Sequence, residues 1–102
     1  SANTQGYLLG KDLKNATSFN EKTLILSSQF GAHFGVFTNY YSDRIIVYKD
    51  TSIDELNTIL NKEDISYVVY IYERETPVIV KNHLDNNFIK IRSNGYEIYK
   101  IN

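Results

Sequence analysis

Residues 65–72 read ISYVVYIY, and this stretch carries the strongest indication of the fold. Its apolar and aromatic side chains occupy both sets of alternating positions of an extended chain, so neither face is suited to water. Strands of this kind lie inside sheets that are covered on both sides. The stretch therefore predicts a central strand in an α/β three-layer sandwich.

The segments before this strand alternate between helical and extended patterns. Apolar spacing over residues 7–16 predicts a short helix, and residues 23–28 (TLILSS) have the length of a strand. Residues 30–41 (FGAHFGVFTNYY) place aromatic side chains on one helical face. Residues 44–48 (RIIVY) then predict a second apolar strand.

Helix-capping signals lie on both sides of the central strand. Before it, the Ser52 hydroxyl is expected to accept the Glu55 amide hydrogen, and the Glu55 carboxylate to reach the Ser52 amide. That helix should end near Lys62. After the central strand, Thr76-Pro77 predicts a helix N-terminus, because proline suits the first helical position.

The C-terminal segment predicts an antiparallel hairpin. Asn94-Gly95 separates the strand-like runs FIKIRS and YEIYKI, and both turn residues tolerate positive φ. The predicted sheet has about five strands and is mostly parallel, Rossmann-like or flavodoxin-like, with right-handed crossovers. With the most apolar strand at its centre, the predicted strand order is 2-1-3-4-5, the last strand being reversed.

Length, charge and composition bound the class of protein. The 102 residues predict one domain, residues 1–102, and the net charge of -1 without basic runs argues against nucleic-acid binding. The absence of cysteine excludes disulfides, thiolate nucleophiles and zinc–thiolate sites. The chain contains no Met and begins Ser1-Ala2, a common remnant of tag removal, so we expect a piece of a longer protein.

The turn after the first predicted strand is the first candidate ligand site. Ser27, Ser28 and Gln29 follow that strand at its carboxyl end, where open α/β sheets bind ligands. Gly31 and Gly35 match neither a dinucleotide fingerprint nor a P-loop. We expect these glycines to permit close packing of a helix, with weak anion binding at its N-terminus as the alternative.

Both histidines lack metal-ligand spacing, so neither a metal nor a cofactor is predicted. His33 lies on or beside the aromatic stripe and favours packing, while His83 lies near the end of a predicted helix. A small hydrolase pairing His33 with Ser28 is a weaker alternative, since the G-x-S-x-G turn is missing. Tyr41 and Arg44 complete the candidate ligand-binding set, although pairing of Arg44 with a carboxylate or helix-end carbonyl oxygen is the simpler interpretation.

Tyrosines and paired carboxylates are interpreted as structural. Aromatic side chains favour half-buried strand positions, and the basic residues needed for nucleic-acid stacking are sparse. The adjacent acids at 54–55 and 63–64 predict solvated charges. The tyrosines on predicted strands are Tyr67, Tyr70, Tyr72, Tyr96 and Tyr99.

The order of these patterns is similar to that of a known domain. The segments that carry the similarity are LILSS (24–28), NYYSDRIIVY (39–48), DELNTIL (54–60), ISYVVYIYE (65–73) and NGYEIYKI (94–101). Over roughly residues 7–102 the chain resembles the extracytoplasmic C-terminal domain of polytopic, polyprenyl-phosphate-sugar-dependent membrane glycosyltransferases of the protein mannosyltransferase-like superfamily.

The resemblance implies a function and a location. The parent would be an integral membrane enzyme with its catalytic acid in loops near the membrane helices, so no catalytic residue carries over to this chain. The chain itself would be a non-catalytic domain on the extracytoplasmic face of the cell membrane, capping the active site or aiding acceptor recognition. Its partners would be the transmembrane part of its own parent chain and a polyprenyl-phosphate sugar or acceptor. The alternative is a free-standing Rossmann-like module that binds a nucleotide or phosphorylated ligand.

Overall fold

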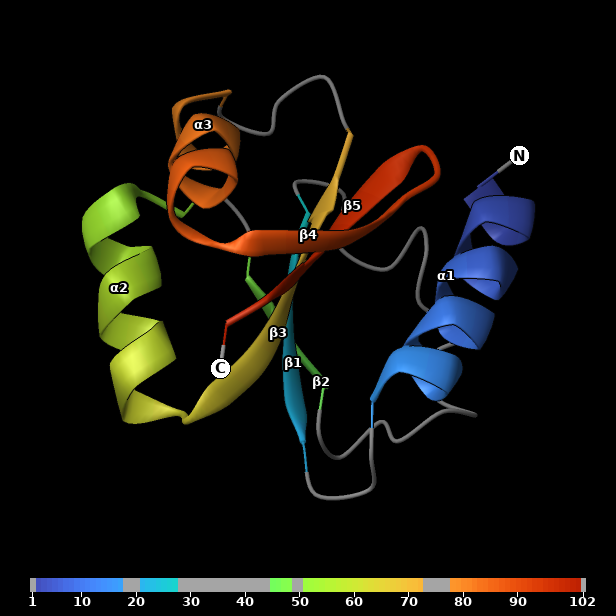
Figure 1. Ribbon diagram of the computed structural model, residues 1–102, viewed down its shortest axis with the longest axis horizontal. Helices are drawn as coiled ribbons and strands as arrows, with labels where there is room; N and C mark the ends of the chain where they lie inside the picture. Colours follow the sequence, from blue (N-terminus) through green and yellow to red (C-terminus); the bar gives the residue numbers. More distant parts are fainter. Residues whose placement is uncertain (1, 18–20, 28–44, 49–50, 73–77, 102) are drawn as a thin grey trace.

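The computed structural model describes residues 2–17, 21–27, 45–48, 51–72 and 78–101. These residues form both helices and strands of one mixed sheet, which confirms the α/β class (Figure 1). In chain order the elements are α1 (Ala2–Ala16), β1 (Lys22–Leu26), β2 (Ile45–Tyr48), α2 (Ile53–Lys62), β3 (Ile65–Ile71), α3 (Val78–Asn87), β4 (Ile89–Ser93) and β5 (Tyr96–Lys100).

The strands form one mixed sheet in the order β2-β1-β3-β5-β4. β1 pairs in parallel with both β2 and β3, whereas β5 pairs antiparallel with β3 and with β4. β3 therefore lies at the centre of the sheet, and among the described strands β5 alone runs against the others, as predicted. Gly95 has a φ of 74° in the turn between β4 and β5, which confirms the predicted hairpin.

The order of the two hairpin strands differs from the predicted 2-1-3-4-5. β5 lies beside β3, and β4 forms the edge of the sheet. Burial explains the difference, because four of the five β5 side chains are buried and all five β4 side chains are exposed. A strand with charged side chains such as Lys90 and Arg92 suits an edge, where it is solvated and discourages further pairing.

Helices cover both faces of the sheet, which confirms the three layers (Figure 1). α1 packs Leu9 and Leu13 against one face, while α2 and α3 pack against the other. β3 supplies alternate side chains to both cores, with Val69 on the α1 side and Val68 on the opposite side. The strand is buried along both faces, as its composition predicts.

Helix boundaries agree with the capping signals wherever the structure describes them. The Glu55 amide donates to Ser52 Oγ at 3.2 Å, and α2 ends at Lys62. Between these two described residues the reciprocal bond from the Ser52 amide to the Glu55 carboxylate does not form. The predicted helix over residues 30–41 and the predicted N-terminus at Thr76-Pro77 lie outside the described residues.

Candidate functional site

Of the six predicted ligand-binding residues, the structure describes Ser27. It follows β1 directly and is 2% exposed. β1 is followed by β2 on one side of the sheet, whereas the adjacent β3 is followed by strands on the other side. The carboxyl ends of β1 and β3 therefore form a topological switch point of the kind that binds ligands. The other five, Ser28, Gln29, His33, Tyr41 and Arg44, lie outside the described residues, and their grouping stays a prediction.

A second group of polar side chains lies where α3 covers the C-terminal hairpin. Its members come from α3, from both hairpin strands and from the residue that follows β3. Most of them are joined by hydrogen bonds or ion pairs. We call the group the α3 cluster; it consists of Tyr72, Lys81, Asp85, Lys90, Ser93, Glu97 and Tyr99.

Asp85 connects α3 to the hairpin. Its carboxylate lies 2.6 Å from Lys81 Nζ and 3.2 Å from Lys90 Nζ, and it accepts a 2.5 Å hydrogen bond from the Tyr99 hydroxyl. The bonds from Lys81 and Tyr99 lower the pKa of Asp85 to about 2. Burial, followed by the bond to Asp85, raises the pKa of Tyr99 far above its ordinary value. Asp85 is therefore held as a carboxylate and Tyr99 as a neutral phenol.

Glu97 is the most enclosed charge of the α3 cluster, with 3% of the residue exposed. Its Oε1 accepts hydrogen bonds from the Tyr72 hydroxyl at 2.5 Å and from Ser93 Oγ at 3.0 Å. Its Oε2 is buried without a hydrogen bond and lies 3.6 Å from Lys90 Nζ. The bond to Glu97 raises the pKa of Tyr72, so Tyr72 is held as a neutral phenol.

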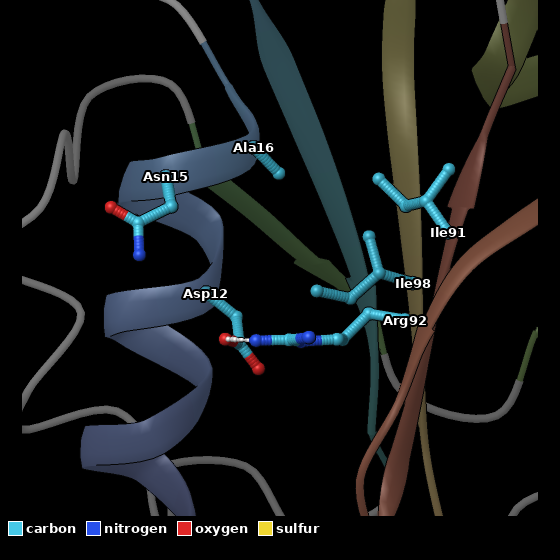
Figure 2. A pocket seen from close by; sticks show the side chains of 6 residues that line it. All are labelled: Asp12, Asn15, Ala16, Ile91, Arg92 and Ile98. Atoms are coloured by element: carbon cyan, nitrogen blue, oxygen red, sulfur yellow. Dashed lines mark hydrogen bonds and ion pairs between the residues drawn. The ribbon is translucent and has the colours of Figure 1, made fainter.

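The opposite face of the sheet carries a similar pairing, which we call the α1 cluster: Asp12, Arg92 and Tyr96. Figure 2 shows Arg92 of β4 reaching across to Asp12 of α1, and Nη2 donates to Oδ1 at 3.0 Å. The Tyr96 hydroxyl donates to the other carboxylate oxygen. Burial alone would raise the pKa of Asp12, but the bonds from Arg92 and Tyr96 outweigh it and hold the pKa below its ordinary value.

A cavity of about 220 Å³ adjoins the α1 cluster (Figure 2). Its polar lining includes Asp12 and Arg92, which already bond each other across it. A ligand would have to compete with this ion pair for either charge. The lining consists of Asp12, Asn15, Ala16, Ile91, Arg92 and Ile98.

A β-bulge in the edge strand β4 lets this strand supply a cation to both clusters. Lys90 is opposite Tyr99, whereas Arg92 is opposite Ile98, so Ile91 is an extra residue in the ladder. In a regular strand, residues 90 and 92 would point to the same face. The bulge instead sends Arg92 to the α1 side and leaves Lys90 on the α3 side.

Both clusters hold a covering helix against the hairpin, and we call them the two locks. Each pairs a carboxylate with a tyrosine hydroxyl and a cation, and each joins a helix to the hairpin. Neither has a nucleophile activated by a base. The ring of His83 contacts Asn87 and Phe88, and the described residues contain no group of three or more His, Cys, Asp or Glu side chains that suits a metal.

Sequence reasoning missed both locks, although β5 contained a signal for them. Tyr96 and Tyr99 are separated by an odd number of positions, so they point to opposite faces of the sheet. A buried tyrosine hydroxyl needs a hydrogen-bond partner, so each covering helix was required to supply one. Asp12 and Asp85 each precede or follow a buried leucine of their helix, which places them at the margin of the apolar face.

Comparison with known proteins gives no match: no family model, no curated protein and no solved structure is similar to this chain. Among the described residues, none of the helices combines the length and the apolar character needed to cross a membrane.

Proposed function

We propose that this chain is a non-catalytic, extracytoplasmic domain of a membrane glycosyltransferase that uses polyprenyl-phosphate sugars. In that role it covers the active site of its parent protein or aids recognition of the acceptor. The proposal starts from the resemblance over residues 7–102. It is supported by the bonds that the Asp12 and Asp85 carboxylates form with tyrosines and cations.

The supporting observation is that the carboxylates of Asp12 and Asp85 bond side chains of the hairpin and so hold a helix against it. A general acid or base needs contact with its substrate and a pKa near the working pH. Asp12 and Asp85 are instead bonded to tyrosines and cations, and both pKa values are lowered. These groups stabilise the layers of the domain, which is what an accessory domain requires.

The test is to express the gene's full reading frame and measure sugar transfer from a polyprenyl-phosphate donor in membranes. We expect hydrophobic spans before residue 7, activity in the full protein, and a strong reduction of activity when residues 7–102 are removed. The chain alone should show no turnover. Transfer catalysed by the chain alone, or a reading frame without hydrophobic spans, would contradict the proposal.

A second candidate function is binding of a nucleotide or phosphorylated ligand by a Rossmann-like or flavodoxin-like module. The observation that favours it is the position of Ser27, buried at the carboxyl end of β1 where the strand order reverses. Thermal denaturation with nucleotides and polyprenyl-phosphate analogues tests it. A rise in Tm that the Ser27→Ala variant loses would support this function, and unchanged Tm values throughout the panel would dismiss it.

A further inference from the structure

A second cavity, of about 460 Å³, lies at the amino end of β3, whereas Ser27 lies at the carboxyl end of the parallel strand β1. It adjoins the end of α2, the junction of α3 with β4, and the residue that follows β5, all near the amino end of β3 (Figure 1). We call it the α2 cavity. Its lining consists of Asn57, Leu60, Asn61, Asp64, Phe88 and Ile101.

Asp64 lies just after the end of α2, at a position where glycine is the usual residue. Its φ of 54° lies in the left-handed region, just after the C-cap of α2 at Glu63. Glycine is the usual residue there, since a side chain makes this conformation costly. A carboxylate is also unfavourable beside the negative end of the helix dipole. Asp64 therefore carries two local costs, and strained residues of this kind are concentrated at functional sites.

The polar side chains of the α2 cavity differ from those of the two locks. Asn57 and Asn61 are one helical turn apart on α2, so they share a face, and both are exposed. Within the described part of the chain, neither these amides nor the Asp64 carboxylate has a hydrogen bond or ion pair. Their donors and acceptors are thus available to a ligand.

The floor of the α2 cavity is apolar and firmly held. Leu60, Phe88 and Ile101 are partly buried and pack against the hydrophobic core under α2 and α3. Phe88 is further fixed by an edge-on contact with the ring of His83. The cavity thus combines amide donors, amide and carboxylate acceptors, and an aromatic–aliphatic surface.

This combination selects a class of ligand. None of the described residues that line the cavity is a cation, and Asp64 is an acidic residue, so phosphates and carboxylates are disfavoured. A purely apolar ligand would leave three polar groups without partners. A pyranose offers neighbouring hydroxyls to amides and carboxylates and an apolar C–H face to a ring, and a cavity of this volume accommodates one or two such units.

We propose that the α2 cavity binds a neutral saccharide. Asp64 accepts hydrogen bonds from two adjacent hydroxyls, the amides of Asn57 and Asn61 bond further hydroxyls, and the sugar ring rests on Phe88. As a site for the acceptor or the transferred sugar it rests on the proposed function. Saccharide binding itself is measured on this chain alone, so either statement can fail without the other.

The first experiment is an NMR titration of the ¹⁵N-labelled chain with glucose, mannose, galactose and N-acetylglucosamine. We expect at least one sugar to shift resonances of residues 57–64, 88 and 101 in a saturable way, with Kd in the millimolar range. Glycerol and calcium chloride serve as controls. Absence of shifts at 50 mM of every sugar, or equal shifts with glycerol or calcium, would overturn the proposal.

Variants give the second experiment. Asp64→Gly should reduce sugar affinity by at least tenfold while raising Tm by about 4 °C, because it removes both local costs. Asn61→Ala should weaken binding severalfold without that gain in Tm. Asn82→Ala, which removes an exposed amide of α3 outside the cavity, should change neither quantity. Unchanged affinity in both cavity variants would contradict the assignment.

Discussion

At the scale of single residues, Asp12 and Asp85 have equivalent structural roles on opposite faces of the sheet. Each lies on a covering helix and accepts a hydrogen bond from a buried tyrosine of β5. A hydrogen bond to a charged group contributes roughly 1.5–3 kcal/mol, and losing one leaves a buried hydroxyl without its partner. Stability should therefore depend on these two carboxylates more than on a carboxylate that bonds no tyrosine or cation.

Replacement of Asp85 by Asn tests this dependence. The change removes the charge that Lys81 and Lys90 pair with and weakens the acceptor of the Tyr99 hydroxyl. We expect the free energy of unfolding in urea at pH 7 to fall by about 1–3 kcal/mol. Asp54→Asn is the matched control in the first turn of α2, where only a helix-dipole contribution of about 0.3–1 kcal/mol is at stake. Equal losses in both variants would refute a special role for Asp85.

The lowered pKa of Asp85 also predicts how stability depends on pH. The folded value is about 2 and the ordinary value is 3.8, so the folded state binds fewer protons between them. The resulting stabilisation is complete above the ordinary value and is lost as pH falls from about 4 toward 2. Urea unfolding measured from pH 7 to pH 2 should show a decline that is shallower in Asp85→Asn. Parallel profiles would contradict the assignment.

At the scale of elements, composition and spacing predicted most of what the structure shows. Continuous apolar runs of strand length located β1 and β3, and the serine cap located α2. The bulge in β4 could not be predicted, because no glycine marks it and the strand reads FIKIRS without a break. The faces of Lys90 and Arg92, and hence both locks, depend on that one extra residue.

Deletion of Ile91 tests the role of the bulge. Without Ile91, Lys90 and Arg92 become neighbours in a regular strand and still point to opposite faces, so both locks keep their cations. We expect the deletion to lower the free energy of unfolding by about 1 kcal/mol or less, well below the roughly 2–4 kcal/mol for breaking paired charges.

The control for this deletion is Ile91→Ala, which keeps the chain length and trims a side chain that is 40% exposed. It should cost about 1 kcal/mol or less. A deletion that costs far more stability than Ile91→Ala would contradict the assignment of Ile91 as the extra residue of the bulge.

At the scale of the whole molecule, the predicted layers and central strand are confirmed, and the positions of the last two strands were wrong. The rule that placed the most apolar strand at the centre applies equally to β5, whose side chains at 96, 98 and 99 are fully buried. Applied to both hairpin strands, it would have placed β4 at the edge. Of the candidate site at residues 27–29, Ser27 lies at the carboxyl end of β1, and the other two residues lie outside the described part of the chain.

The observed strand order predicts the result of truncation after Ser93. Under the order 2-1-3-4-5 the chain would lose only an edge strand, whereas here it loses the strand between β3 and β4. We expect the truncated chain to lose the amide dispersion of a folded protein in NMR spectra. Ile89→Ala, which trims a side chain that is 70% exposed on β4, should leave the spectrum folded. A native-like spectrum of the truncated chain would refute the inner position of β5.

The inner position of β5 has a consequence for biosynthesis. While a ribosome is still adding residues 96–100, one side of β3 has no neighbour and its backbone amides and carbonyls stay open to any extended peptide nearby. The nascent polypeptide thus completes its sheet only when nearly the last residues of this segment emerge from the exit tunnel. Chaperone shielding during translation should accordingly matter more for the yield of this segment than its 102 residues imply.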